Sequence, residues 1–322
     1  MESRFLLAAV AVSGLGLVAG CGLGDAPPSD VSAGSLAEAG DLSGVALSVG
    51  GKEFTEQLIL CEVTAQVLES AGAEVKRTCG LSGSSTVRSA LTSGDIDMYW
   101  EYTGTGWITH LGETEAIADP QELFQAVAAE DKEKNQIAWL DPAPANNTYA
   151  VATSREKSEE LGVKTLSDYA ALANSDADKA SFCGAAEFFG RDDGWPGLQD
   201  AYGFKVPGKN VSELAAGAIY NSIDKAKPCA FGEVFATDGR IAALDLVVLE
   251  DSEHFFTVYN PAVSIRQDVL DQNPKVADVL APLAEALTDE TLQSLNAEVD
   301  VDGSTPEDTA KKWLVEEGFV GE

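Results

Sequence analysis

Few residues in this 322-residue chain have the types and spacing that catalysis requires. His110 and His254 are the only histidines, and neither belongs to a metal-binding motif. The sequence has no Gly-x-Ser-x-Gly segment for a nucleophilic serine and no phosphate-binding loop ending in Gly-Lys-Ser or Gly-Lys-Thr. Carboxylates are abundant, so a pair for glycoside hydrolysis stays open, although no two of them stand out. We therefore expect no enzyme activity, no metal site and no cofactor.

Acidic residues outnumber basic residues by 53 to 21, which gives a net charge of −32. This charge makes nucleic acid and anionic lipid poor partners. It also concentrates small cations near the protein, within a screening length of about 8 to 10 Å. A solvated acidic surface is the simpler interpretation. Residues 80–85, rich in glycine and serine, could bind an anion at the start of a helix, or they could be an ordinary loop with an N-cap.

The N-terminus has the pattern of an export signal. Residues 5–18 are apolar, Arg4 precedes them, and the segment ends in small residues before Cys21. This run is too short for a membrane span, so we predict a signal peptide at residues 1–20. The small-small-Cys ending resembles the bacterial lipobox, in which Cys21 would carry lipid and anchor the protein to the membrane. An ordinary secretory signal with a nearby cysteine is the alternative. Residues 21–44 are predicted to be a flexible linker.

Four cysteines follow Cys21, an even number in a chain that is expected to be exported. Their order in the sequence predicts one disulfide between Cys61 and Cys79 and another between Cys183 and Cys229. Each bond would restrain the unfolded chain by roughly 3 to 4 kcal/mol in the chain-entropy account. Two pairs of buried free thiols are the alternative.

Hydrophobic periodicity predicts alternating strands and helices. The first series contains strands at 45–49, near 75–77, at 96–100 and at 137–140. Its helices are one with Thr55 as the N-cap and two that span 84–93 and 122–135. Its β-α-β-α-β order predicts a parallel sheet with crossover helices. A second series runs from Tyr149 to Leu249, and the chain ends in helices at 274–287, 288–296 and from Thr305 onward. These last helices have no strands between them, so we expect them to pack against the first series.

The pattern predicts an α/β protein of two lobes. One lobe would contain residues 45–148 and 258–322, and the other residues 149–257. Each lobe would have a mostly parallel sheet flanked by helices. Ligands of open α/β sheets bind at the carboxyl ends of the strands, so we expect a ligand cleft between the lobes.

Four segments resemble the quaternary-amine substrate-binding proteins of ABC importers, the glycine betaine, choline and carnitine family. They are Gly51-Lys-Glu-Phe-Thr-Glu-Gln57, Gly94-Asp-Ile-Asp-Met-Tyr-Trp-Glu-Tyr-Thr-Gly-Thr105, Asn146-Asn-Thr-Tyr149 and Thr237-Asp-Gly239. Their order and spacing cover almost the whole mature chain. The resemblance implies a type II periplasmic-binding-protein fold, a lipid-anchored location outside the cytoplasm, a monomer and an ABC permease as the partner.

The resemblance also implies a set of ligand-binding residues. A trimethylammonium group has no N–H to donate, so it is held by aromatic faces, each worth about 0.5 to 2 kcal/mol. The implied cage consists of Tyr102, Tyr149, Phe235 and Tyr259. The residues implied to hold a betaine carboxylate are Lys52, Thr105 and Arg191, with Glu187 one turn before Arg191 as its orienting partner.

Two positions differ from the family pattern. Asn147 stands where some relatives have an aspartate near the cationic head, and Phe235 stands where relatives often have tyrosine. The ligand class is therefore better defined than the ligand. We predict glycine betaine or a related osmolyte, with choline or carnitine as the alternative of the same fold. A secreted hydrolase and a structural surface lipoprotein are more distant alternatives, which would show turnover or no saturable binding.

Overall fold

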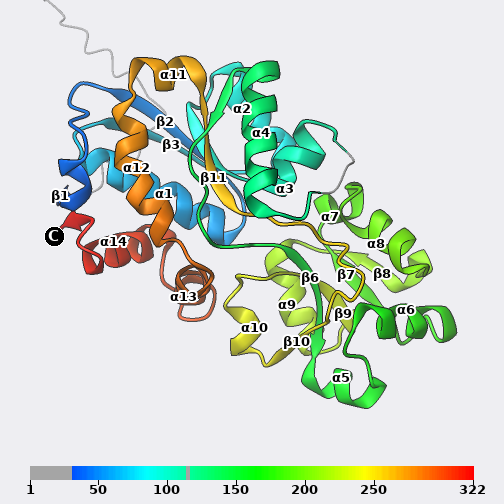
Figure 1. Cartoon of the computed structure of the whole chain (residues 1–322). Coiled ribbons are helices and arrows are strands. Elements are labelled where there is room, and N and C mark those ends of the chain that lie inside the picture. Colours follow the sequence, from blue (N-terminus) through cyan, green and yellow to red (C-terminus); the bar gives the residue numbers. More distant parts are fainter. Residues whose placement is uncertain (1–30, 114–116) are drawn as a thin grey trace, which may run out of the picture.

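A computed structural model of the chain describes residues 31–113 and 117–322. The predicted signal peptide at residues 1–20 and the lipidation site at Cys21 lie outside the described residues. The described chain forms two lobes, each built around a five-stranded sheet (Figure 1). None of the helices in the described ranges is long and apolar enough to cross a membrane.

The first sheet contains the strands that the first series predicted, with one strand from later in the chain. In spatial order its strands are β3 (Glu74–Leu81), β2 (Ala46–Lys52), β4 (Met98–Tyr102), β11 (Pro261–Arg266) and β5 (Ile137–Trp139). Strands β2, β3 and β4 are parallel, whereas β11 is antiparallel to both neighbours. The sheet is therefore mixed, because β11 enters it after the chain has returned from the second lobe.

The second sheet is mixed for a similar reason. Its order is β10 (Leu246–Val248), β6 (Tyr149–Ser154), β9 (Phe231–Phe235), β7 (Phe182–Gly184) and β8 (Val211–Glu213). Strands β7, β8 and β9 are parallel, while β6 is antiparallel to β9 and β10. Half of the strand pairings in each sheet are thus antiparallel. The predicted two-lobed α/β fold is confirmed, but its two sheets are mixed and not mostly parallel.

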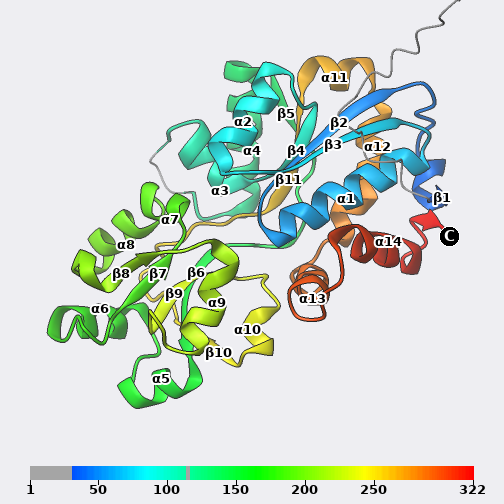
Figure 2. The ribbon, with the colours of Figure 1, turned by 180° about the vertical axis from the view of Figure 1, so that it is seen from behind.

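Helices cover both faces of the first sheet. They are α1 (Thr55–Ser70), α2 (Ser84–Ser93), α3 (Thr103–Thr105), the π-helical turn η2 (Gly106–His110), α4 (Pro120–Asn135), α11 (Gln267–Gln272), α12 (Lys275–Ala286), α13 (Asp289–Asp300) and α14 (Pro306–Glu316). Helix α1 contacts α12, α13 and α14, so the C-terminal helices pack on the first lobe as predicted (Figure 2). The buried side chains of α2 and α4 form a separate apolar cluster with the sheet.

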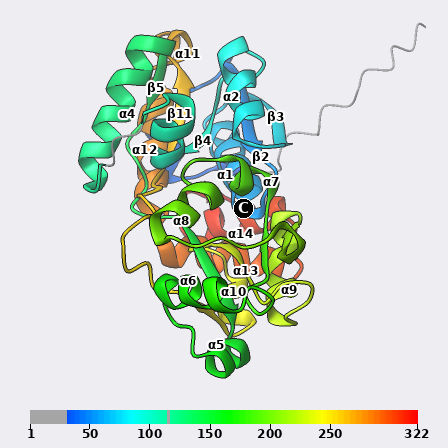
Figure 3. The same ribbon diagram turned by 90° about the vertical axis from the view of Figure 1, so that its right-hand side faces the viewer.

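Helices also surround the second sheet. They are α5 (Arg155–Leu161), α6 (Leu166–Ser175), α7 (Ala186–Gly190), α8 (Trp195–Tyr202), the 3₁₀ turn η3 (Gly208–Asn210), α9 (Ala216–Asp224) and α10 (Arg240–Ala243). A side view shows the two lobes one above the other, with α13 near the junction (Figure 3).

Local signals in the sequence account for several helix ends. Thr305 is the N-cap of α14, its hydroxyl accepts the Asp308 amide, and Pro306 occupies the first position, as predicted. Gly94 ends α2 in the left-handed conformation, with φ 84°, which a side chain rarely adopts. Both ends were predictable because the responsible residues act on their own backbone.

The flexible linker predicted for residues 21–44 is wrong for its last part. Residues 32–33 form strand β1, which pairs with β12 (Val320–Gly321), and residues 35–38 form the 3₁₀ turn η1. Leu36 and Leu42 are 3% and 1% exposed and belong to the core of the first lobe. The glycine content of the segment favoured the linker interpretation. Burial of the two leucines, however, holds the segment against the core of the first lobe.

Both predicted disulfides are present. Cys61 in α1 is bonded to Cys79 in β3, and Cys183 in β7 is bonded to Cys229 just before β9. Each bond joins elements within one lobe, so neither restricts movement between the lobes.

Two segments connect the lobes and lie against each other. They are residues 140–148 and 249–260, and the Asn147 amide donates to the Tyr259 carbonyl at 3.1 Å. The Thr148 hydroxyl donates to the Thr257 carbonyl at 3.1 Å. The lobe boundaries at residues 148 and 257 stay a prediction, because each falls within one of these connecting segments.

Candidate ligand-binding site

A cavity of about 820 Å³ lies between the lobes. Much of its wall is formed by residues at or just after the carboxyl ends of β2, β3 and β4 in the first lobe and of β7, β8 and β9 in the second. Parallel strands place such residues at one edge of a sheet, where α/β proteins bind ligands. All eight predicted ligand-binding residues line this cavity, namely Lys52, Tyr102, Thr105, Asn147, Tyr149, Arg191, Phe235 and Tyr259.

Five aromatic rings adjoin one another in the cavity. The Tyr149 ring centroid lies 5.4 Å from that of Phe235 and 5.6 Å from that of Tyr259, the second contact being edge-to-face. Phe54 stacks on Phe235 at 5.0 Å and lies 6.2 Å from Tyr102. The rings come from both lobes and from a connecting segment, so their arrangement depends on the relative position of the lobes.

Strand register explains why two of these rings meet. Tyr149 is the first residue of β6 and Phe235 the last of β9, and the antiparallel ladder pairs them directly. Phe235 has no hydroxyl to hold it, but its amide donates to the Tyr220 hydroxyl at 2.9 Å. Tyr220 itself is buried among apolar side chains.

Phe54 was not predicted as a site residue. It lies in the family segment at residues 51–57 and immediately precedes α1, so it was interpreted only as the approach to a helix. Its extended backbone turns the ring toward Phe235 instead of into the core. The sequence contained one signal for this role, an aromatic residue two positions after the predicted ligand-binding residue Lys52.

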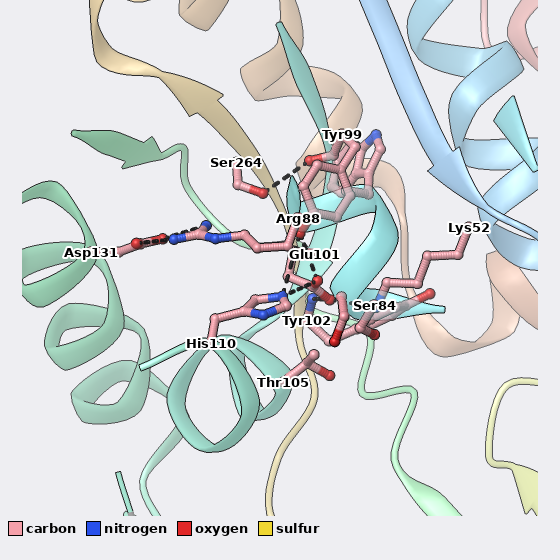
Figure 4. Close-up of polar contacts among 12 residues, drawn as sticks. Lys52, Ser84, Arg88, Tyr99, Glu101, Tyr102, Thr105, His110, Asp131 and Ser264 are labelled. Carbon is pink, nitrogen blue, oxygen red and sulfur yellow. Dashed lines mark hydrogen bonds and ion pairs between the residues drawn. The ribbon is translucent and has the colours of Figure 1, made fainter. Parts of the chain in front are cut away.

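Lys52 is neutralised by a buried carboxylate. Its Nζ lies 2.6 Å from Glu101 Oε1 and 5.0 Å from the Tyr102 ring centroid (Figure 4). Glu101 also accepts hydrogen bonds from the Tyr99 hydroxyl and the Tyr102 amide, both at 2.8 Å, and its Oε2 lies 2.8 Å from His110 Nε2. Burial alone would raise the pKa of Glu101, but Lys52 and His110 hold it well below the usual range. Glu101 is therefore ionised, and Lys52 adds no net charge to the cavity.

A second buried ion pair joins helices α2 and α4. Arg88 of α2 donates to Asp131 of α4 (Figure 4). The Trp139 indole donates to the same carboxylate at 2.7 Å. Asp131 is 1% exposed, so removing either charged partner would leave an unpaired buried charge. The pair fixes α2, whose first residues line the cavity.

Arg191 is likewise paired with carboxylates. Its Nε donates to Asp193 at 2.7 Å, its Nη2 donates to the same group, and its Nη1 donates to Glu187 at 2.9 Å. The predicted Glu187 partner is thus present, whereas Asp193 was not predicted. Thr105 Oγ1 lies 3.4 Å from the guanidinium, whose Cζ is 5.5 Å from the Tyr149 ring centroid. The guanidinium is held in one position and stacked on a cage residue.

Glu187 joins the two lobes. Its carboxylate accepts hydrogen bonds from the Ser84 amide at 3.0 Å and the Ser84 hydroxyl at 2.6 Å, at the start of α2 in the first lobe. Residues 80–85 therefore hold an anion at a helix N-terminus, but this anion belongs to the protein. Burial would raise the pKa of Glu187, yet Lys52, Arg191 and the Ser84 bonds keep it below its usual value.

Glu56 connects the cage to the rest of the junction. It is 2% exposed and accepts hydrogen bonds from the Tyr102 hydroxyl and the Asn147 amide group, both at 2.8 Å. It also accepts from the Thr237 hydroxyl and, at 3.1 Å, from the Asn296 amide group. Burial raises the pKa of Glu56 despite these donors. An asparagine at position 147 suits this carboxylate, because an aspartate would repel it.

Glu233 is a further cavity residue that the sequence did not indicate. It lies in β9, two residues before Phe235, and is 2% exposed. Its Oε2 accepts the Ala185 amide at 2.7 Å. Burial, with a smaller contribution from the charge of Glu187, raises its pKa to about 8, although the Ala185 bond and Arg191 act in the opposite direction.

The chain is similar in sequence to proteins that are named for binding glycine betaine or ergothioneine. Residues 45–316 match the family described as the substrate binding domain of the ABC-type glycine betaine transport system. The chain belongs to this family. Its members are extracytoplasmic substrate-binding components of ABC importers, which bind small quaternary amines and work with a permease.

Three relatives illustrate the family. A glycine-betaine-binding protein of Pseudomonas aeruginosa is 36% identical over 275 residues, covering 84% of this chain and 87% of that protein. The glycine betaine-binding protein YehZ of Escherichia coli is 34% identical over 85% of this chain and 91% of its own length, and its ligand-free structure superimposes with a TM-score of 0.62. The ergothioneine permease and binding protein EgtU of Helicobacter pylori is 32% identical over 83% of this chain, which spans 47% of EgtU.

We predict that Glu187→Gln weakens the contact between the lobes. Glutamine would present an amide N–H₂ group to Ser84 or to Arg191, where a carboxylate oxygen now accepts hydrogen bonds. The population of closed molecules should fall, and quaternary-amine affinity should drop about five- to tenfold. Small-angle scattering without ligand, together with calorimetry, would measure both. Ser84→Ala is the matched change on the other lobe, and full affinity in both variants would contradict the contact's role.

Glu233→Gln should alter how stability depends on pH. The unfolded side chain titrates near 4.5, and the folded one at about 8. Between these values the folded protein retains a proton that the unfolded chain releases, so the stability that Glu233 contributes is complete below about pH 4.5 and is lost as the pH rises to about 8. Urea unfolding across this range should show a steeper decline for wild type than for the variant. Parallel curves would be inconsistent with the raised pKa.

Proposed function

We propose that this protein captures glycine betaine or a related quaternary-ammonium osmolyte between its lobes and delivers it to an ABC permease. The observation that carries the proposal is the set of five adjoining rings in one cavity whose two cations are already paired with carboxylates. A methylated ammonium ion is attracted to ring faces and, in this cavity, meets no unpaired positive charge among the described residues.

Donors for a ligand carboxylate remain at the other side of the cavity. The Lys52 ammonium has three N–H groups, and Glu101 is the one described side chain that it bonds. Thr105 accepts from Arg191 through its oxygen, which leaves the hydroxyl hydrogen available. We infer that Lys52 and Thr105 donate to the carboxylate, while the guanidinium of Arg191 is bonded to Asp193, Glu187 and Thr105.

Choline is the second candidate. It has no carboxylate, and the pairing of Lys52 and Arg191 with internal carboxylates means that neither cation requires one from the ligand. The same rings would hold its trimethylammonium group. Carnitine, which has both a carboxylate and a hydroxyl, is compatible with the same cavity.

Replacing a cage tyrosine should abolish most of the affinity. Tyr149→Ala or Tyr102→Ala removes one ring from around the cation, and we expect binding to weaken roughly 10- to 30-fold or more while the fold persists. Isothermal titration calorimetry against glycine betaine, proline betaine, carnitine, choline and ectoine measures this. Tyr202→Ala is the control, because Tyr202 does not line the cavity. Undiminished affinity in both cage variants would refute the cage, and a wild type that binds none of these ligands would refute the proposed function.

We further propose that Cys21 carries a lipid anchor and that the exported protein is a monomer. The small residues before Cys21 support the first point. Cys21→Ser should release the protein from the membrane fraction of producing cells, as membrane flotation would detect. Equal membrane retention of the wild type and the variant would contradict the anchor.

A further inference from the structure

Glu233 differs from the other carboxyl groups around the cavity. Glu101, Asp193 and Glu187 each form an ion pair with Lys52 or Arg191. Glu233 is 2% exposed and more deeply buried than Asp193 or Glu187, but no ion pair to it is found within residues 31–113 and 117–322. Burying a carboxyl group without a cation is costly, so a specific use for it is expected.

One oxygen of Glu233 is left for a ligand. Oε2 accepts the Ala185 amide, and in the described part of the chain no hydrogen bond reaches Oε1. Side chains two residues apart on a strand point to the same face, so Glu233 shares its face with the cage residue Phe235. Both residues line the cavity. The unbonded oxygen therefore lies at the wall that a bound quaternary amine would contact.

The cations near Glu233 are committed elsewhere. Arg191 lowers the pKa of Glu233 by its charge, but its guanidinium bonds Asp193, Glu187 and Thr105. Glu187 acts in the opposite direction and raises the pKa. Arg191 is therefore not available to pair with Oε1 of Glu233, and a ligand in the cavity can supply a partner.

We propose that Glu233 accepts a hydrogen bond from an N–H or O–H group of the ligand, and that the preferred ligand is a betaine that carries such a donor besides its methylated nitrogen and its carboxylate. This inference rests on the proposed function and narrows the ligand class. The cavity has room for a third recognition group, because its volume of about 820 Å³ lies in the upper part of the range, roughly 300–1,000 Å³, of pockets for small organic ligands.

A buried hydrogen-bond acceptor discriminates between ligands because leaving it without a donor costs free energy. Without a ligand Glu233 retains its proton up to about pH 8, whereas the positive charge of a bound ligand favours the ionised carboxylate. A ligand with a suitable donor then completes the hydrogen bonding of that carboxylate. A ligand without a donor fills the cavity but leaves the group desolvated and unpaired. Sites built in this way separate ligands that differ by a single N–H or O–H group more strongly than apolar pockets separate ligands that differ by one methylene.

The test uses the full mature chain, three ligands and two variants. Glycine betaine has no N–H or O–H donor, carnitine has a hydroxyl group and ergothioneine has a ring N–H. In Glu233→Gln, the amide oxygen keeps the Ala185 bond, so the N–H₂ group faces the cavity and opposes a ligand donor. Glu213→Gln, which removes a negative charge from another cavity-lining residue, is the matched control. Affinities are measured by calorimetry in one buffer.

We expect wild type to bind at least one donor-bearing ligand more tightly than glycine betaine. Glu233→Gln should weaken that ligand at least tenfold and change glycine betaine less than threefold, whereas Glu213→Gln should affect all three ligands equally. Equal losses for every ligand in Glu233→Gln, or no loss for the donor-bearing ligands, would overturn the inference and leave the proposed function intact. Tighter wild-type binding of glycine betaine than of both other ligands would overturn it too. If wild type bound none of the three, the inference would fail, and the proposed function would fail with it only if proline betaine, choline and ectoine did not bind either.

Discussion

A cavity that receives a permanent cation can contain lysine and arginine only if their charges are balanced from within the protein. At about 4 Å, two unit charges interact by about 4 kcal/mol when the effective dielectric constant is about 20, so an unbalanced Lys52 or Arg191 would cost as much as several rings provide. Glu101 balances Lys52, and Asp193 with Glu187 balances Arg191. Glu101 in strand β4 is completely buried, and its Oε2 contacts Tyr99 and His110 while its Oε1 accepts from Lys52 and the Tyr102 amide. The aromatic cage can be selective for a cation because these ion pairs leave no unbalanced positive charge on Lys52 or Arg191.

The same kind of carboxylate contact connects the two lobes. Glu187 of the second lobe bonds the start of α2 in the first lobe, and Glu56 of the first lobe bonds Thr237 of the second. Hydrogen bonds of this type can be exchanged for water when a cleft opens, at a much smaller cost than separating a packed aliphatic core. Glu56 also bonds the Tyr102 hydroxyl, so one carboxylate group fixes a cage ring and contacts the opposite lobe. Opening of the lobes and disassembly of the cage are therefore expected to occur together.

The sequence predicted features that neighbouring residues determine, such as helix ends. It missed features that depend on residues far apart in the chain, such as the buried ion pairs. Helix ends at Thr305 and Gly94 depend on their own backbone, and both disulfides follow the order of the cysteines. The eight ligand-binding residues that the family resemblance implied all line one cavity. Glu101 lies 49 positions from Lys52, and among 53 acidic residues nothing in its type distinguishes it. The segment at residues 32–44 was misjudged because average composition outweighed two leucines whose burial is decisive.

Ring faces and polar groups provide different information about the ligand. Glycine betaine, carnitine and choline all present a trimethylammonium group, so a cage of tyrosines and phenylalanines binds this shared part and cannot separate them by contact with it. Discrimination must arise where the molecules differ, at the carboxylate, the hydroxyl or a ring N–H. The polar residues that we propose for those positions are Lys52, Thr105 and Glu233, all of which line the cavity. Of the three, Glu233 has the clearest consequence, because a buried group with one unbonded oxygen penalises every ligand that fails to supply a donor. The ligand class therefore follows from aromatic residues that the sequence segments reveal, whereas the ligand's identity depends on a carboxyl group whose environment only the folded chain creates.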